Sequence, residues 1–330
     1  MKRIKLLKII FSSLLLFGGT NHLKIIFLAS VPFVISTNNL YANEEFSIEL
    51  GSFYQKKGNH KEAIRYFSKF INHPSGMSAA GRAMSKYELG DKYGSITDYE
   101  KAISLMKRSQ YNNPELSAYY YKTIGNIRSE LKNFNGAIDA FNKSIDLNYD
   151  HYVLALRGAA KYTLNQYVGA INDYSAALQI DPQNHLYLLK RGEARLFFGN
   201  YDDAIRDLDR VINFNTKAPN VYYYLGLSYF KLQKWEKAVT YFSNHIKRNR
   251  KDLEAFAYRS TANLNLKNNS AAIKDQNKVI RNNFNKPEML FQRGVAKLRL
   301  KKSKSACKDL EESVLLGWEK SIQVKNEYCE

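Results

Sequence analysis

Five arginines in this sequence are each followed, sixteen residues later, by an aspartate. A guanidinium group can bind a carboxylate through two parallel hydrogen bonds, which makes such pairs strong and directional. At the same spacing elsewhere, Leu50, Ile124 and Leu225 replace the arginine, and Tyr66, Ala140 and Tyr241 replace the aspartate. Because the two residue types occur together or not at all, we expect contact within each pair, with a structural and not a catalytic role. The pairs are Arg82 with Asp98, Arg157 with Asp173, Arg191 with Asp207, Arg259 with Asp275, and Arg293 with Asp309.

Patterns that would indicate an enzyme are absent from the sequence. The six histidines have no metal-ligand spacing. No phosphate-binding loop, dinucleotide fingerprint or nucleophile motif occurs. The sequence therefore predicts no catalytic residue, no metal site and no cofactor.

The Arg–Asp pairs belong to a longer pattern, because the sequence resembles itself with a period of 34 residues from residue 44 onward. Gly158, Gly192 and Gly226 mark the eighth position of three successive repeats, and a small residue also stands at the twentieth position. Isoleucine, leucine or valine dominates positions twenty-one and twenty-eight. The repeats start at residues 44, 76, 118, 151, 185, 219, 253 and 287.

Each repeat has apolar residues at helical spacing on both sides of a turn signal such as Gly58-Asn59 or Gly199-Asn200. The small residues let two helices approach closely, and the aliphatic positions fill the space between repeats. A single hairpin cannot bury its apolar face, so the repeats must stack. Residues 110–117 are an insertion that predicts a hinge or a lengthened helix. Residues 317–330 read as one more amphipathic helix that caps the stack.

The fourth repeat carries the clearest family pattern: Arg157-Gly158, Lys161, Tyr167, Ala170, Tyr174, Ala177 and Asp181-Pro182. This pattern resembles the tetratricopeptide repeat (TPR) family, and the resemblance covers residues 44–316. It implies an all-α fold, a right-handed superhelical solenoid of about eight helical hairpins with a C-terminal capping helix.

The resemblance also implies a binding surface, because the first helix of each TPR hairpin lines a concave groove. Aromatic residues are favoured at such contacts since they bury much area with few rotamers. The alternative is that several of these side chains pack against neighbouring helices. The matching residues are Tyr119, Lys122, Asn126, Tyr152, Tyr162, Leu186, Leu189, Glu193, Phe197, Tyr223, Leu227, Phe230 and Phe291.

Some family members hold a C-terminal carboxylate with lysine, asparagine and arginine side chains. Lys122 and Asn126 match the first two of these residues, and Lys190 could replace the last. Leu156 and Leu186 stand where polar residues are required. The match is poor, and we do not expect a carboxylate clamp.

The two cysteines lie close to the C-terminus. Cys307 takes the repeat position that isoleucine or valine holds in the other repeats, so it could be a small buried apolar side chain. Alternatively, antiparallel helices on either side of Gly317 would bring Cys307 level with Cys329, which permits a disulfide in an oxidising compartment.

Residues 1–42 precede the repeats and contain a basic start and two apolar runs, 9–18 and 25–36. Each run is shorter than the ~20 residues that span a bilayer and matches the apolar core of a secretory signal. We expect a cleaved export signal, with cleavage after Ala42, or an uncleaved membrane anchor. An over-long start or a short buried helix is the remaining interpretation. The basic start predicts that the repeats are translocated to a periplasm, a lumen or the outside.

The net charge of +19 favours acidic partners, anionic membranes or nucleic acid. Export would separate the chain from nucleic acid, so we expect no nucleic-acid partner. The sequence predicts a scaffold or assembly factor that binds another protein. The alternatives are contact with an anionic membrane surface and a non-catalytic subunit of an enzyme complex.

Overall fold

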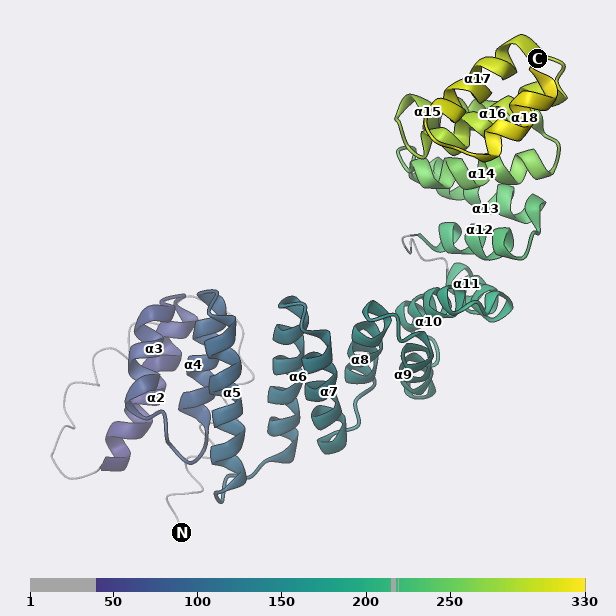
Figure 1. Cartoon of the computed structure of the whole chain (residues 1–330). Helices are drawn as coiled ribbons and strands as arrows, with labels where there is room; N and C mark the ends of the chain where they lie inside the picture. The colour runs from purple at the N-terminus through teal and green to yellow at the C-terminus, as the bar shows by residue number, and fades with distance from the viewer. Residues whose placement is uncertain (1–39, 215–217, 219, 330) are drawn as a thin grey trace, which may run out of the picture. The chain divides into compact units, whose positions relative to one another are not determined.

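The computed structural model describes residues 40–214, 218 and 220–329 (Figure 1). Every regular element in these residues is a helix, which confirms the all-α prediction. Residues 1–39, which contain nearly all of the predicted signal or anchor, lie outside the described part. Among the described residues, no helix is long and apolar enough to cross a membrane. Contacts divide the chain into two compact units, residues 1–70 and 71–330.

The first unit contains one hairpin, made of α2 (Leu40–Lys56) and α3 (His60–Lys69). The ring of Phe67 packs so closely on Gly51 that a methyl group there would lie 2.6 Å from it. Tyr54 stacks on Tyr66 with ring centroids 5.3 Å apart. Apolar and aromatic contacts therefore hold this hairpin together.

In the second unit, each helix packs against the next in the chain. The hairpins are α4 (Met77–Glu88) with α5 (Lys92–Lys107), α6 (Pro114–Glu130) with α7 (Phe134–Leu147), α8 (His151–Thr163) with α9 (Tyr167–Ile180), α10 (His185–Phe198) with α11 (Tyr201–Asn213), α12 (Val221–Lys231) with α13 (Trp235–Arg248), α14 (Leu253–Asn265) with α15 (Asn269–Arg281), and α16 (Lys286–Arg299) with α17 (Ser303–Leu315). A last helix, α18 (Lys320–Tyr328), packs on α17. This consecutive pairing confirms the predicted solenoid class, while its handedness and the number of repeats stay predictions.

The turns inside the hairpins follow the expected chemistry. Gly90 and Gly199 have φ of 86° and 96°, a left-handed conformation that costs glycine little. In the next residue, the side chains of Asp91 and Asn200 accept a hydrogen bond from the first turn of α5 and α11. These two features end one helix and begin the next within a few residues.

The core repeats with the hairpins. Ala137, Ala170, Ala204 and Ala238 are all completely buried at the small twentieth position, where the two helices of a hairpin approach. The insertion at 110–117 becomes a short connection and the first turn of α6, with Asn113 as N-cap. Of the two predicted outcomes, the lengthened helix is therefore the one observed, since α6 has 17 residues and α8 has 13.

Candidate partner-binding surface

The first helices of successive hairpins contact one another, α6 with α8, α8 with α10, and α10 with α12. Residues at the same repeat position are therefore neighbours in space. We call the side chains of α6, α8, α10 and α12 that do not pack on the second helices the first-helix surface.

Four large apolar side chains on this surface are open to solvent. Tyr119, Tyr152, Leu186 and Phe197 are between 47% and 53% exposed. Tyr119, Tyr152 and Leu186 take the second repeat position on α6, α8 and α10, so these three form a row across three hairpins, while Phe197 lies at the other end of α10. Exposed apolar side chains that lie together mark sites of protein contact more often than scattered ones do.

Two predicted contact residues are not available to a partner. Leu189 and Leu227 are each only 6% exposed and belong to the apolar core. They lie at repeat positions five and nine, which face the neighbouring first helix. Their role here is packing between hairpins.

Tyr223 and Phe230 are half-buried in an aromatic cluster. Tyr258 of α14 packs edge-on against both rings, at centroid distances of 6.4 and 5.1 Å. Phe230 also meets Trp235 at 5.2 Å. These two residues join α12 to its neighbours, and Phe291 on α16 is likewise half-buried.

Glu193 on α10 is the centre of a polar node within this surface, although it is only 7% exposed. Its Oε1 accepts hydrogen bonds from the hydroxyls of Tyr162, at 2.9 Å, and Tyr224, at 2.8 Å. Its Oε2 accepts from Lys190 Nζ at 3.0 Å. Burial and the charge of Glu193 raise the pKa of both tyrosines, so their hydroxyls stay protonated and able to donate. The node ties α8, α10 and α12 together beside Leu186 and Phe197.

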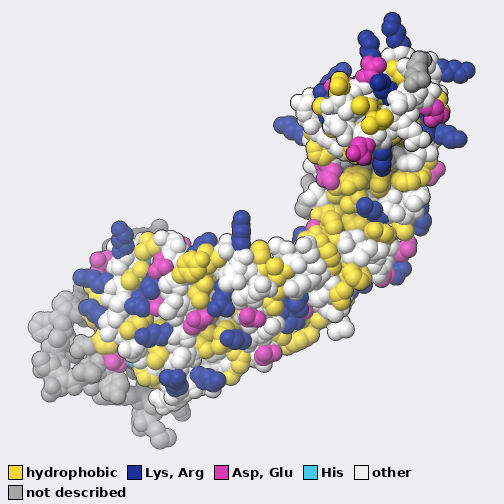
Figure 2. Space-filling view, in the orientation of Figure 1, with side chains coloured by type: hydrophobic (Ala, Val, Ile, Leu, Met, Phe, Trp, Pro, Cys, Tyr) yellow, Lys and Arg dark blue, Asp and Glu magenta, His cyan; other side chains and the backbone are white. Residues whose placement is uncertain are grey.

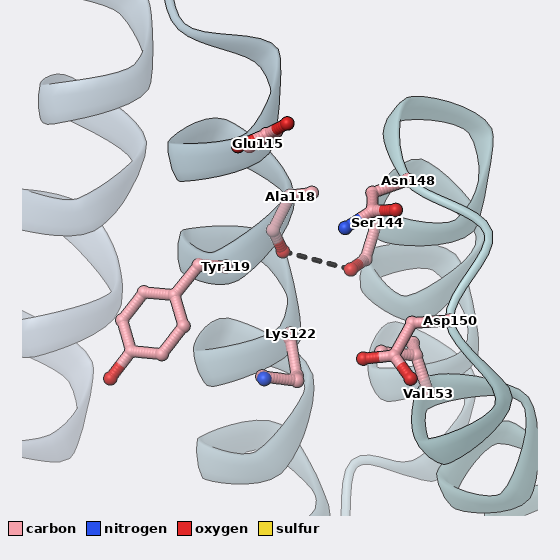
Figure 3. A pocket seen from close by; sticks show the side chains of 8 residues that line it. All are labelled: Glu115, Ala118, Tyr119, Lys122, Ser144, Asn148, Asp150 and Val153. Atoms are coloured by element: carbon pink, nitrogen blue, oxygen red, sulfur yellow. Dashed lines mark hydrogen bonds between the residues drawn. The ribbon is translucent and has the colours of Figure 1, made fainter.

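A small pocket of about 180 Å³ lies next to Tyr119, between α6 and the start of α8 (Figure 3). Lys122 stands over the rings of Tyr119 and Tyr152, at 5.1 and 5.9 Å from their centroids. The carboxylates of Glu115 and Asp150 also line the pocket. Two carboxylates there disfavour a carboxylate ligand, and Lys190 is engaged by Glu193, so the arrangement does not resemble a carboxylate clamp. Asn126, the other residue of that pattern, is half-buried on α6.

The structure brings each predicted Arg–Asp pair together. Every arginine lies on a first helix, every aspartate on the second helix of the same hairpin, and the paired N–O distances are 2.6–3.0 Å. Burial raises the pKa of the Asp98 carboxyl, but hydrogen bonds and charge from Arg82 and Lys86 lower it by more, so the pKa lies below its usual value. The pairs are structural elements of the hairpins.

Two further contacts of these Arg–Asp pairs were not predicted from the sequence. In four of the five pairs a second cation four residues after the arginine also binds the aspartate, as Lys161 does at 2.9 Å from Asp173. The remaining arginine nitrogen donates to the preceding hairpin, as Arg157 does to Asn142 at 2.7 Å. The signal was present, because Ser175, Ser243 and Asn277 take the same repeat position and accept from Arg191, Arg259 and Arg293. Each such arginine links its own hairpin to the one before it.

Cys307 of α17 and Cys329, which follows α18, form a disulfide with a Cα–Cα distance of 5.5 Å. Of the two interpretations of Cys307, the structure has the bonded one. No group of three or more potential ligands that could hold a metal ion occurs within residues 40–214 and 220–329.

Comparison with known families agrees with this architecture. A model described as TPR repeat matches residues 199–233, and models described as tetratricopeptide repeat match residues 220–250, 45–72 and 118–151. The predicted resemblance to tetratricopeptide repeats is therefore confirmed over these residues. No curated protein matches it.

Several solved structures share the fold at low sequence identity. A tetratricopeptide repeat protein from Parabacteroides merdae ATCC 43184 is 18% identical, with a TM-score of 0.54 over 77% of this chain and 97% of that one. YrrB, described as a TPR protein with an unusual peptide-binding site, is 18% identical, with a TM-score of 0.52 over 57% of this chain and 99% of its own. Naa15/Naa10 bound to HypK-THB is 13% identical, with a TM-score of 0.51 over 87% of this chain and 44% of that one. These likenesses show the fold alone.

Proposed function

We propose that this protein is a non-catalytic scaffold that binds a segment of another protein along the first-helix surface. The observation that carries the proposal is the exposed row of Tyr119, Tyr152 and Leu186 on three successive hairpins, with the exposed Phe197 at the other end of α10. Large rigid side chains of this kind supply most of the binding energy at protein interfaces. In Figure 2 hydrophobic side chains also gather around α12 and its neighbours.

The shape of the row indicates the kind of ligand. Its members come from α6, α8 and α10, so the ligand must run across these helices and present several apolar side chains. An extended peptide or an amphipathic helix meets this requirement. A peptide is also the class of ligand named in the description of YrrB.

We further propose that the repeats work outside the cytoplasm, after export or while anchored to a membrane. The basic and apolar segments of residues 1–42 support this location. The Cys307–Cys329 disulfide supports it independently, because such bonds persist in oxidising compartments. N-terminal sequencing of the protein from its native membrane fraction would find a start at Asn43 if the signal is cleaved, and Met1 if it is an anchor.

Affinity capture of the tagged full-length protein from the same fraction tests the binding surface. The double variant Tyr152→Ala/Leu186→Ala should lower partner recovery at least about tenfold, because each anchor contributes on the order of 1–2 kcal/mol. The matched control is Leu315→Ala, which truncates an exposed leucine on the second helix α17. Thermal unfolding of each variant shows whether the fold is intact. Partners that survive the double variant, or that are lost equally with Leu315→Ala, contradict the proposed surface.

A further inference from the structure

A second and larger pocket, of about 500 Å³, opens on the second helices, between α13 and α15 with α14 behind them. Its volume lies within the range of roughly 300–1,000 Å³ that ligand-binding clefts occupy. None of its lining residues belongs to the first-helix surface. We call it the basic pocket, because its charged lining consists of Lys247, Arg250, Arg259, Lys274 and Lys278 with one carboxylate, that of Asp275.

The single carboxylate is already neutralised. Arg259 donates two hydrogen bonds to Asp275, each of 2.8 Å, so this pair adds little net charge. Lys247, Arg250 and Lys274 are exposed and have no ion-pair partner among the residues that the structure describes. The pocket therefore presents uncompensated positive charge to a ligand.

The floor of the pocket is apolar. Phe256 and Ile246 are buried there, each 8% exposed. Lys278 Nζ lies 3.8 Å from the centroid of the Phe256 ring and donates to the carbonyl of Arg250, which fixes one wall. The pocket therefore suits a ligand that combines carboxylates with an apolar group.

A counterpart in another part of the second unit shows that the repeat alone does not create this charge. It is a pocket of about 380 Å³ lined by residues of α5, α6 and α7. Tyr121 and Lys143 take the repeat positions of Phe256 and Lys278, and Lys143 Nζ lies 5.5 Å from the Tyr121 ring centroid. Asp146, which has no ion-pair partner in the described residues, also lines this pocket and offsets its lysines.

We propose that the basic pocket binds an acidic peptide segment of a partner protein, with carboxylates beside Lys247, Arg250 and Lys274 and an apolar side chain beside Ile246 and Phe256. Charge complementarity supports this occupant. A membrane surface fits less well, because membrane contact needs exposed apolar side chains and none of the large hydrophobic residues in the described stretch 243–278 is exposed. The site lies on other helices than the first-helix surface, so the two can bind different segments.

Fluorescence polarisation with purified full-length protein tests this site. The probe is a labelled Glu-Glu-Leu-Glu-Glu-Leu peptide, and its comparison is the same peptide with glutamine in place of glutamate. We expect the acidic probe to bind at least about tenfold more tightly in low salt, and to weaken as salt screens the contact. The exposed double variant Lys247→Glu/Lys274→Glu should lose at least about tenfold in affinity.

Two controls separate this proposal from other interpretations. Lys143→Glu reverses the charge of a lysine in the counterpart pocket and should leave affinity within about twofold. Tyr152→Ala/Leu186→Ala should also leave it unchanged, which makes the outcome independent of the proposed scaffold surface. Equal binding of the two peptides, or an equal loss with Lys143→Glu, would overturn the proposal. So would binding to phosphatidylserine vesicles or to a single-stranded RNA without binding to the acidic peptide.

Discussion

The two helices of a hairpin are held together in two different ways in this protein. The ionic hairpins, such as α8–α9, have an arginine and an aspartate that face each other across the two helices. The apolar hairpins, α2–α3, α6–α7 and α12–α13, have an aliphatic residue in place of the arginine. In these three, a phenylalanine ring packs directly on a glycine of the first helix, as Phe242 does on Gly226. In the ionic hairpins that have this glycine, the facing side chain is tyrosine or leucine.

This difference shows that either an ion pair or apolar packing can stabilise the same backbone geometry. The two kinds of hairpin use different residues to bond to the neighbouring hairpin. In the ionic hairpins from α8–α9 onward the arginine itself donates to the previous hairpin, as Arg157 does to Asn142. In an apolar hairpin another residue makes this link. Arg128 binds Glu100 at 2.9 Å for α6–α7, and Tyr224 binds Glu193 at 2.8 Å for α12–α13.

The strongest test of the comparison is to break one ionic hairpin. Asp173→Ala leaves Arg157 and Lys161 without their carboxylate, and we expect it to lower the free energy of unfolding by about 2–3 kcal/mol. The double variant Arg157→Ile/Asp173→Ala copies the residues of α6–α7 and should recover much of that loss, because the unpaired guanidinium is removed and only the Lys161 ammonium lacks its carboxylate. Urea unfolding measures both. If the double variant lost as much free energy of unfolding as Asp173→Ala and Arg157→Ile lose together, the two chemistries would not be interchangeable.

A smaller effect is expected from filling the glycine contact of an apolar hairpin. In Gly226→Ala the new methyl group would lie 2.8 Å from the buried Phe242 ring, so we expect a loss of about 2 kcal/mol from overpacking. Gly158→Ala is the matched change in an ionic hairpin, where the nearest atom of Tyr174 is 3.2 Å away. There the helix propensity of alanine offsets the contact, and the net change should stay within about 0.5 kcal/mol. Thermal unfolding compares the two, and equal losses would contradict the distinction.

A smaller loss of stability is expected when one hydrogen bond between neighbouring hairpins is removed. Tyr224→Phe removes one donor from Glu193 and leaves Tyr162 and Lys190 in place. We expect a loss of about 1 kcal/mol in the free energy of unfolding, the usual contribution of one hydrogen bond to a charged acceptor that keeps other partners. Tyr152→Phe, which removes an exposed hydroxyl, is the control and should have no effect. An unchanged stability in both variants would show that Glu193 does not need this donor.

The smallest expected difference between the two kinds of hairpin is in how much stability each loses at low pH. The pKa of Asp98 is lower in the folded chain than in the unfolded one. Its contribution is therefore present above the unfolded pKa of about 4 and is lost as the pH falls through the folded value. Hydrogen exchange at pH 7 and at pH 3 should show a larger loss of protection in α4–α5 than in α6–α7. Asp98→Asn should remove this pH dependence in α4–α5, and a similar loss in both hairpins of the wild type would contradict the assignment.

Much of the fold was predictable because it depends on contacts within one repeat. The joint occurrence of Arg157 and Asp173 predicted a contact across a single hairpin, and the structure contains it. The sequence left open which of the groove residues pack against neighbouring helices, and that Leu189 and Leu227 are among them depends on how closely the hairpins approach. The same holds for Glu193, whose two tyrosine donors come from hairpins on either side. The basic pocket was also hidden in the sequence, since Lys247 and Lys274 meet only after the hairpins stack.

The bond between Cys307 and Cys329 has a mechanical consequence. It closes a covalent loop between two residues 22 positions apart, and this loop contains α18 and most of α17. A pull on the C-terminus would be transmitted through the sulfur atoms into α17, and it could not peel α18 away one turn at a time. Residues 308–328 would therefore carry no load as long as the two cysteines stay bonded.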